Sequence, residues 1–406
     1  MATPHYICVP NQDMETEPKL NFNDTSVAFS YKSDSELKKA NFIFTLVSNP
    51  TISRLATSAA KIGLALHLPV KGLIRGTVFG HFCGGETIQQ SEKTIASLSR
   101  FHVGTILDYS VEGAKTEEGF EQTTRETLLT FEKAKGNPSV PFCVFKVTGL
   151  ATMELLEKVQ SKATLSETEK QDFAKLKSRV DRICAKAFEY GVPVLIDAED
   201  SWIQGTIDEL TYEMMQKYNQ QKAIVFNTFQ MYRADMLGNL KNAYEEAKKN
   251  KYLLGVKMVR GAYMEKEAAR AEKMNYADPI HPNKAATDEG FNKGLEFCVT
   301  HLDQITLMCG SHNEFSNEYL TVLMAKHGIK NNDERVWFAQ LLGMSDNISF
   351  NLAKAGYNVA KYVPYGPVEA VMPYLIRRAS ENTSVAGQSG RELTMIRKEL
   401  ARRKGR

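Results

Sequence analysis

The run Val192-Pro193-Val194-Leu195-Ile196-Asp197 is apolar and β-branched and stops at a charged residue. A short run of this kind is typical of a strand that is buried on both faces. Seven others lie after residue 100, and each is followed by a stretch with helical spacing. They are Gly104–Asp108, Phe142–Lys146, Ala223–Asn227, Gly255–Val259, Ile305–Cys309, Val336–Gln340 and Val359–Tyr362.

The alternation of strand and helix predicts a parallel sheet. Eight repeats without an antiparallel hairpin signal favour a closed α/β barrel of the TIM (β/α)8 type over an open doubly wound sheet. In such barrels the loops at the carboxyl ends of the strands build the active site. We therefore expect the residues that end the runs to face one pocket.

The segments outside the repeats predict additional helices. Ser33 followed by Glu36 resembles a capping box, so a helix should begin there and run to Leu46. A second helix is expected over residues 50–67, and a third over 86–99, with a glycine-broken segment from Val70 to Gly85 between them. Residues 152–177 predict one extra, peripheral helix between the second and third strands.

Three parts of the chain are predicted: an N-terminal helical region over 1–99, a catalytic barrel over 100–390 and a basic C-terminal tail over 391–406. The tail holds seven Lys or Arg and two Glu, whereas the whole chain has a net charge of +3. The basicity is thus a property of the tail, which we interpret as a solvated terminus, with attraction to an anionic membrane as the alternative. Nothing suggests nucleic-acid binding.

The composition, with 43% hydrophobic and 24% charged residues, is that of a globular protein with a large core. Six cysteines are scattered without paired spacing, which predicts reduced thiols and a cytoplasmic location. We expect no signal peptide, and no apolar run is long enough to span a bilayer. No metal is expected, because the Cys309 to His312 spacing has no second ligand cluster.

Polar residues end or follow most of the predicted strands. Any one of them could be a rim ion pair or a helix cap, but burying many charges costs several kcal/mol per ion unless each is partnered by a ligand or by another charge. On a helix after the last strand, Arg377 and Arg378 could form a carboxylate clamp or a solvated surface pair with Glu381. The sequence therefore predicts a barrel enzyme for a small anionic substrate. The strand-end set is Asp108, Glu112, Lys146, Asp197, Asn227, Lys257, Arg260, Ser311, His312, Gln340 and Tyr362.

Five motifs together resemble the proline dehydrogenase family of FAD-dependent enzymes, over residues 104 to 385, and Leu195 to Glu199 fits as well. The motifs are Val256 to Tyr263 (VKMVRGAY), Gly310 to Asn313 (GSHN), Ala339 to Met344 (AQLLGM), Tyr362 to Gly366 (YVPYG) and Tyr374 to Asn382 (YLIRRASEN). The resemblance implies a distorted β/α barrel with FAD over the carboxyl ends of the strands and the last helix above the barrel. It further implies hydride transfer from C5 of L-proline to flavin N5, giving Δ1-pyrroline-5-carboxylate.

The resemblance also implies a role for each matching residue. Asp197, Lys257 and Tyr362 would be catalytic, with Asp197 at the floor of the site. The substrate would contact Lys146, Tyr263, Leu341, Arg377 and Arg378, and Glu112 would pair with Arg377. Glu381, which helical spacing places within reach of both arginines, would hold them together in the empty site. The flavin would contact Ala198, Asn227, Val259, Arg260, Gly261, Ala262, Ser311, His312 and Asn313. Asn227 stands where the family commonly has Gln, and Lys257 where it commonly has Arg, which leaves the flavin's redox tuning open.

The family resemblance implies partners too. A membrane quinone would accept the electrons, which suggests a cytoplasmic enzyme peripheral to the inner face of a membrane through its basic tail. A separate pyrroline-5-carboxylate dehydrogenase would consume the product. Three alternatives stay open: a hydroxyproline dehydrogenase of the same family, against which Tyr362 argues; a Schiff-base barrel aldolase using Lys146 or Lys257; and a basic-tailed scaffold protein.

Overall fold

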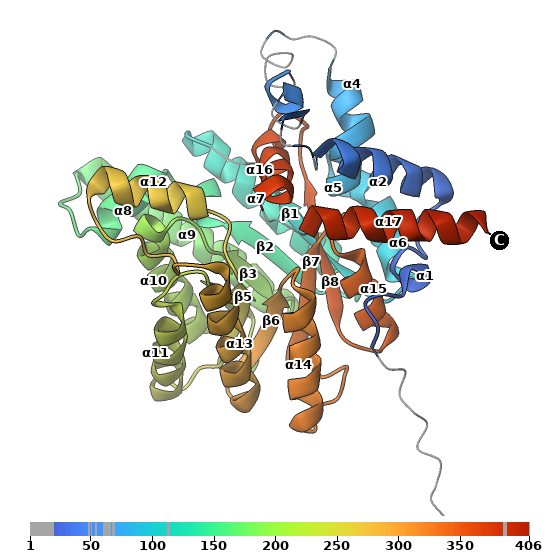
Figure 1. The fold of residues 1–406 in the computed structure, drawn as a ribbon. Coiled ribbons are helices and arrows are strands. Elements are labelled where there is room, and N and C mark those ends of the chain that lie inside the picture. Colours follow the sequence, from blue (N-terminus) through green and yellow to red (C-terminus); the bar gives the residue numbers. More distant parts are fainter. Residues whose placement is uncertain are drawn as a thin grey trace, which may run out of the picture.

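The computed structural model describes residues 20–47, 49, 51–52, 55–59, 66, 70–111, 114–384 and 388–405. Its centre is a closed barrel of eight parallel strands in the order β1 to β8 (Figure 1). The strands are β1 Val103–Tyr109, β2 Phe142–Lys146, β3 Val194–Asp197, β4 Val225–Gln230, β5 Leu254–Val259, β6 Ile305–Gly310, β7 Val336–Leu341 and β8 Val359–Tyr365. The predicted barrel is confirmed.

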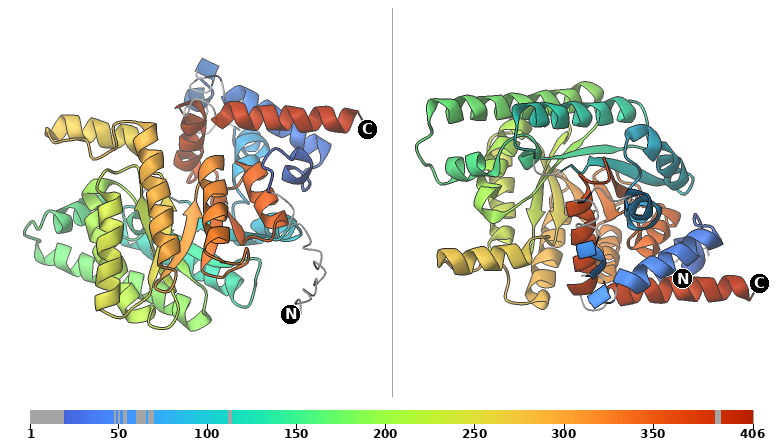
Figure 2. Two further views of the ribbon diagram at one scale, coloured as in Figure 1. Left: turned by 60° about the horizontal axis from the view of Figure 1, so that its bottom comes forward. Right: turned by 90° about the horizontal axis from the view of Figure 1, so that it is seen from above.

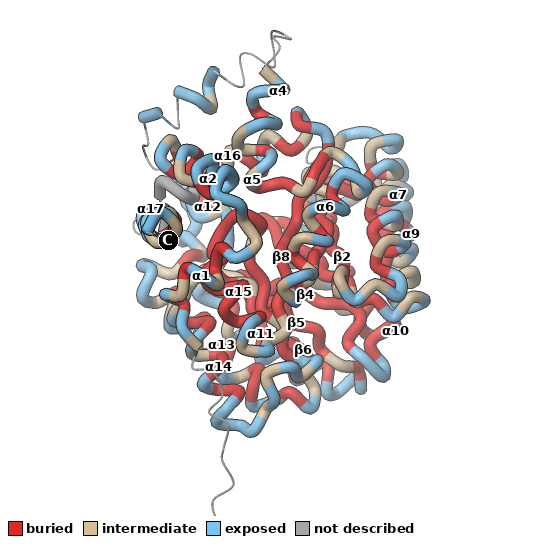
Figure 3. Tube along the Cα trace, turned by 90° about the vertical axis from the view of Figure 1, so that its right-hand side faces the viewer, coloured by how far each residue is buried: buried red, intermediate tan, exposed pale blue. Residues whose placement is uncertain are grey.

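Apolar side chains fill the barrel, as the unbroken apolar runs require. The interior cluster includes Ile106, Val144, Leu195, Phe226 and Met308, each exposed by 2% or less. A larger cluster lies between the strands and the surrounding helices, and Figure 3 shows the buried strands inside a shell of half-exposed helices. With its interior packed, the barrel has room for ligands at its ends.

The barrel helices follow the strands. They are α7 Glu117–Ala134, α8 Met153–Gln160, α9 Glu167–Tyr190, α10 Ser201–Tyr218, α11 Met236–Lys249, α12 Met264–Met274, α13 Lys284–Thr300, α14 Glu314–Lys326 and α15 Asp346–Lys354. The single helix predicted over 152–177 is wrong, because α8 ends at Gln160 and Ser166 starts α9 with a capping box to Glu169. Because Ser166 is the N-cap of α9, it cannot lie in the interior of one continuous helix over 152–177.

The N-terminal region is helical, as predicted. It contains α1 Thr25–Ala28, α2 Asp34–Val47, α4 Lys71–Ile74, the π-helical turn η1 Arg75–Phe79, α5 Gly80–Phe82 and α6 Ile88–Ser99. The Ser33–Glu36 capping box is present, with the Ser33 N–H donating to Glu36 at 2.8 Å. Gly72, Gly76 and Gly80 do not break the helix as predicted, because α4, η1 and α5 follow one another directly and bury Ile74, Phe79 and Phe82. Gly84 and Gly85 do lie in the break between α5 and α6. Most of the helix predicted over 50–67 lies outside the described residues.

The chain ends in two helices, α16 Met372–Ser384 and α17 Gln388–Lys404. Helix α16 lies above the strand ends rather than beside the barrel, as the family resemblance implies (Figures 1 and 2). The prediction of a solvated tail is wrong for residues 391–404, because α17 packs against α2 and buries Met395 and Ile396. Its arginines are largely used internally: Arg402 and Arg403 both pair with the buried Glu399.

Among the described residues, no helix has both the length and the apolar character needed to cross a bilayer. The five described cysteines are free thiols and are buried. Burial raises the pKa of Cys143 and of Cys309 to about 12, so these thiols are unreactive packing residues.

Candidate active site

Asp197, the last residue of β3, is the centre of a charged cluster at the carboxyl ends of the strands. Its two oxygens accept hydrogen bonds from Lys146 at the end of β2, at 2.7 Å, and from Lys257 on β5. The hydroxyl of Tyr362 on β8 lies 3.4 Å from the same carboxylate, and the Lys257 ammonium lies 4.6 Å from the centre of the Tyr362 ring. Four strands that are distant in sequence thus meet at one carboxylate.

The cluster is buried: Asp197 is 9% and Lys257 6% exposed. Burial alone would raise the pKa of Asp197, but the charges of Lys146 and Lys257 outweigh it and lower the pKa to about 2. Burial lowers the pKa of Lys257, and Asp197 counteracts that effect. Two ammonium groups therefore share one carboxylate, and these three groups together carry net positive charge.

Glu199 reinforces the wall between β2 and β3. It accepts from the Thr148 N–H at 3.0 Å and from the Thr148 hydroxyl, and its backbone carbonyl accepts from Gln230 at 2.7 Å. Burial raises the pKa of Glu199 to about 7. These bonds hold the segments that carry Lys146 and Asp197 in a fixed relation.

The opposite side of the rim is rich in hydrogen-bond donors. Arg260 donates to Asp288 at 2.8 Å, to the Ser311 hydroxyl at 2.8 Å and to the Ser316 hydroxyl at 3.0 Å. Three of its five N–H groups are accounted for by these bonds, and its guanidinium lies 4.4 Å from the centre of the Phe291 ring. The guanidinium is thus held in place by the protein.

The chain after β5 approaches its neighbours closely at Gly261. Its φ is +137°, and a Cβ there would lie 2.5 Å from the Tyr232 ring, so only glycine fits. Val259 and Arg260 accept backbone bonds from Met231 and Tyr232 at 2.8 and 2.7 Å, which fixes the turn. Ala262 and the half-buried Tyr263 follow and lead into α12.

His312 and Asn313 lie between β6 and α14. Asn313 caps α14, because its side chain accepts from the Ser316 N–H at 3.0 Å. His312 Nδ1 lies 2.9 Å from the Ser345 hydroxyl. Burial, reinforced by Lys361, Arg378 and Arg260, lowers the pKa of His312 to about 3, so the imidazole is neutral.

Arg377 and Arg378 reach the site from α16. Arg378 is 7% exposed, and its guanidinium lies 5.2 Å from the Tyr374 ring centre. The charge of Arg378 lowers the pKa of His312, and the charge of Arg377 acts on Asp200, beside Glu199. The two guanidiniums thus act on groups that follow different strands, Asp200 after β3 and His312 after β6.

A model of the proline dehydrogenase family matches residues 91–391, which include every strand of the barrel. The chain belongs to the proline dehydrogenase family. It is 33% identical to proline dehydrogenase 1, mitochondrial, from Dictyostelium discoideum over 94% of this chain and 74% of that protein. It is 31% identical to hydroxyproline dehydrogenase from Xenopus laevis over 96% of this chain and 91% of that protein.

The fold agrees with the family assignment. The crystal structure of proline utilization A from Bdellovibrio bacteriovorus, inactivated by N-propargylglycine, aligns with 90% of this chain at a TM-score of 0.69 and 20% identity. This chain covers 37% of that protein. At this identity the likeness shows the fold alone.

The structure brings together most residues that the proline dehydrogenase resemblance selects, with exceptions. Asn227 does not reach the site: it lies within β4, opposite Ile196 and Val256, and donates to Asp208 of α10 at 2.8 Å. The predicted end of the fourth strand, at Asn227, lies three residues too early, because β4 ends at Gln230. Glu112 and the side chain of Glu381 lie outside the described residues.

Leu341, Tyr362 and Ala198 complete the rim. Leu341 ends β7 beside Tyr362 on β8, and Ala198 directly follows Asp197. Sequence reasoning missed Gln230, Thr148 and Ser345, and assigned Glu199 no role of its own. Of these, Gln230 could have been found by extending the apolar run through Thr228 and Phe229 to the next polar residue.

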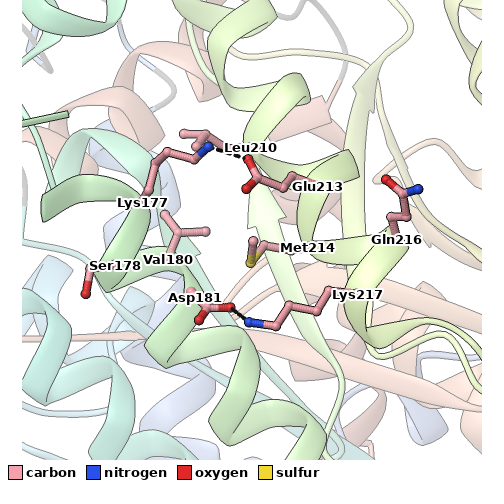
Figure 4. Close-up of a pocket in the computed structure, with 9 residues that line it drawn as sticks. All are labelled: Lys177, Ser178, Val180, Asp181, Leu210, Glu213, Met214, Gln216 and Lys217. Carbon is pink, nitrogen blue, oxygen red and sulfur yellow. Dashed lines mark hydrogen bonds and ion pairs between the residues drawn. The ribbon is translucent and has the colours of Figure 1, made fainter. Parts of the chain in front are cut away.

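A surface groove of about 570 Å³ lies elsewhere, between α9 and α10 (Figure 4). Ion pairs of 2.8 Å between Lys177 and Glu213 and of 2.7 Å between Lys217 and Asp181 cross it. None of the predicted site residues lines it. Among the described residues, no group of three His, Cys, Asp or Glu is placed to hold a metal ion.

Proposed function

We propose that this member of the proline dehydrogenase family oxidises L-proline to Δ1-pyrroline-5-carboxylate with FAD. One observation supports this proposal. The ammonium groups of Lys146 and Lys257 share the buried carboxylate of Asp197, and α16 adds the two guanidiniums of Arg377 and Arg378. This set suits the carboxylate of a small amino acid. Leu341 and Tyr362 supply apolar surface for a ring.

The rim residues also fit FAD. Arg260 and the amino-terminal end of the 13-residue helix α14 offer donors for phosphate, and Gly261 lets a ligand approach the backbone. We propose that Val259, Arg260, Gly261, Ala262, Ser311, His312 and Asn313 hold the cofactor, with Ala198 and Gln230 nearby. When bound, FAD would supply the acceptor for the hydride that leaves C5 of proline.

The protein's own part in catalysis is to bind and orient the substrate. In the proposal, Lys146, Arg377 and Arg378 anchor the carboxylate, while Tyr362, Leu341 and Tyr263 fix the ring. Lys257 is held by Asp197 at the floor, where its charge can stabilise negative charge that develops on the oxidant. Positioning of this kind supplies a large share of catalysis.

The direct test is the visible spectrum of the purified protein. We expect flavin absorbance that bleaches when L-proline is added without oxygen. A colourless protein that fails to bind added FAD would exclude the flavoenzyme. Trapping of a carbonyl substrate on lysine by borohydride would instead support the aldolase alternative.

Hydroxyproline is the second candidate substrate, because a relative of 31% identity is named hydroxyproline dehydrogenase. Tyr362 argues for proline. Its hydroxyl lies 3.4 Å from Asp197, and we propose that its buried ring would crowd a substituted substrate. Steady-state comparison of the two amino acids decides between them. A larger kcat/KM for hydroxyproline would reverse the assignment.

Arg378→Met should weaken proline binding by about 1.5–3 kcal/mol, or roughly 10- to 150-fold in Kd, because one charge-assisted contact is lost. Methionine keeps an unbranched apolar side chain next to the Tyr374 ring and removes the guanidinium group. The dependence of the anaerobic flavin-reduction rate on proline concentration measures Kd. Arg397→Met, on the exposed face of α17, is the control and should leave Kd unaltered. An unchanged Kd in the Arg378 variant would contradict the carboxylate clamp.

We propose a membrane quinone as electron acceptor, with the enzyme cytoplasmic and peripheral to the membrane. A separate pyrroline-5-carboxylate dehydrogenase would consume the product. The basic tail, residues 391–406, stays a candidate contact with lipid through its exposed Arg397, Lys398 and Lys404. We propose that the barrel over 100–390 is the catalytic domain and that residues 1–99 form a separate helical region.

Replacing Arg397, Lys398 and Lys404 together by Gln should weaken binding to anionic vesicles by about 3 kcal/mol, at about 1 kcal/mol for each charge near the surface. Co-sedimentation with vesicles that contain phosphatidylserine measures the binding, and neutral vesicles are the control. Equal binding by both proteins would remove the tail from the proposal.

A further inference from the structure

The turn that follows β7 connects the C-terminal helix α17 with the flavin side of the proposed site. The Ser345 N–H donates to the Glu392 carboxylate of α17, and the Ser345 hydroxyl lies 2.9 Å from His312 Nδ1. Glu392 is 6% and Ser345 3% exposed. Figure 1 shows α17 passing close to α15. Helix α15 begins at Asp346, directly after Ser345. One residue therefore joins a helix outside the barrel to an imidazole at its rim.

Ser345 has an unfavourable backbone conformation. Its φ is +50°, in the left-handed region that costs a residue with a Cβ about 1 kcal/mol or more. Its side chain does not cap α15. The conformation is compensated by the two bonds it permits, because the backbone N–H meets Glu392 while the hydroxyl meets His312.

Other groups hold the rest of the turn. Lys361 donates to the carbonyls of Leu341, at 3.3 Å, and Met344, and His81 Nε2 lies 3.0 Å from the Gly343 carbonyl. These contacts fix the path of the chain up to residue 344. At Ser345 itself, the carbonyl accepts from the Ile348 and Ser349 N–H groups at the start of α15, and the N–H donates to Glu392. Glu392 is thus the contact that ties the backbone of this residue to α17.

We propose that Glu392 is a positioning residue for the flavin site. By holding the Ser345 N–H, it orients the Ser345 hydroxyl toward His312 Nδ1 and so sets the ring orientation of the neutral imidazole. His312 can then present Nε2 to the cofactor in one fixed direction. This inference rests on the proposed binding of FAD at this rim, and it makes α17 a part of the active site.

The experiment measures FAD retention by the holoenzyme, from the recovery of flavin fluorescence after dilution. Glu392→Ala should raise the Kd for FAD on the order of tenfold, which is the loss of one well-made hydrogen bond. Glu392→Gln keeps a carbonyl oxygen that can accept the same N–H, so its Kd and its flavin spectrum should match the wild type. Rescue by Gln separates a positioning role from a need for charge.

Glu399→Ala is the matched control. Glu399 is a second buried glutamate of α17, but it pairs with Arg402 and Arg403 and does not contact the turn. We expect it to lower the thermal midpoint without changing the Kd for FAD. Equal increases in Kd for the Glu392 and Glu399 variants would overturn the proposal, because both would then act by loosening α17.

Ser345→Gly provides a second test if Glu392→Ala folds poorly. Glycine accepts φ +50° without strain and keeps the N–H for Glu392, but it lacks the hydroxyl. The thermal midpoint should hold or rise while the Kd for FAD increases. An unchanged Kd would overturn the relay to His312. A wild-type protein that binds no FAD would instead remove the proposed function, which the spectrum reveals before any variant is made.

Discussion

Asp197→Ala is expected to lower the free energy of unfolding by about 3–5 kcal/mol and to abolish proline oxidation, because it removes the carboxylate that pairs with the buried Lys257 ammonium. Asp197 is the acceptor for both Lys146 and Lys257, and Lys257 is 6% exposed. Without the carboxylate, two like charges face each other at the end of the barrel. Urea unfolding followed by circular dichroism measures the change.

Asp181→Ala is the control for Asp197. Asp181 also pairs with a lysine at 2.7 Å, but that pair, with Lys217, is on the surface. Its loss should cost less than about 1 kcal/mol. If the two variants lost the same stability, burial would not be the reason for the Asp197 effect.

The pH dependence of the same site has a definite sign. The pKa of Asp197 is lowered to about 2 in the folded protein, below that of an ordinary aspartate. Its contribution to stability is therefore complete above about pH 4 and is lost as the pH falls toward 2. The acid-induced loss of stability should be smaller in Asp197→Ala. Midpoints of urea unfolding at pH 3 and pH 7 give the comparison.

The barrel could be predicted from the sequence because each strand is a short apolar run that ends in a polar residue. The eight runs match β1 to β8, and Phe142–Lys146 has the observed bounds. The predicted end of a strand is wrong where the strand continues through small polar residues. Thr228 is buried inside β4 and donates to the Ile196 carbonyl at 2.7 Å, so the strand continues to Gln230.

The connections around the barrel were not predictable in the same way. Charge composition suggested a solvated tail, but Glu392 and Glu399 bury their side chains and organise α17 against the protein. Ser345 shows no signal in sequence, because its partners are 33 residues before it and 47 residues after it. Such contacts follow from the closure of the barrel, which brings distant residues to one rim.

The second large effect concerns Lys361, whose side chain is fully buried in β8. Its ammonium lies 2.9 Å from Asp346 and donates to the carbonyls of Leu341 and Met344. Lys361→Met keeps the volume but leaves Asp346 and both carbonyls without this donor. We expect a loss of about 3–5 kcal/mol in the free energy of unfolding.

Lys177→Met is the control for Lys361, since Lys177 pairs with Glu213 at 2.8 Å with both side chains more than 40% exposed. It should change stability by less than about 1 kcal/mol. The double variant Lys361→Met/Asp346→Asn should be less destabilised than the sum of the single variants. Asp346 keeps Tyr31 and Lys32 as partners in Lys361→Met but loses its buried ammonium, and Asn removes the negative charge that this ammonium neutralised. Strict additivity would show that the two groups do not interact.

Lys361 should also affect function without contacting the substrate. The turn it holds begins at Leu341, which borders Tyr362, and ends at Ser345, which contacts His312. If the turn shifts, both the ring pocket and the imidazole move with it, so Lys361→Met should raise the Kd for proline and for FAD together. Arg378→Met, in contrast, should raise the Kd for proline alone. The ratio of the two constants in each variant therefore distinguishes a displaced turn from a lost carboxylate contact.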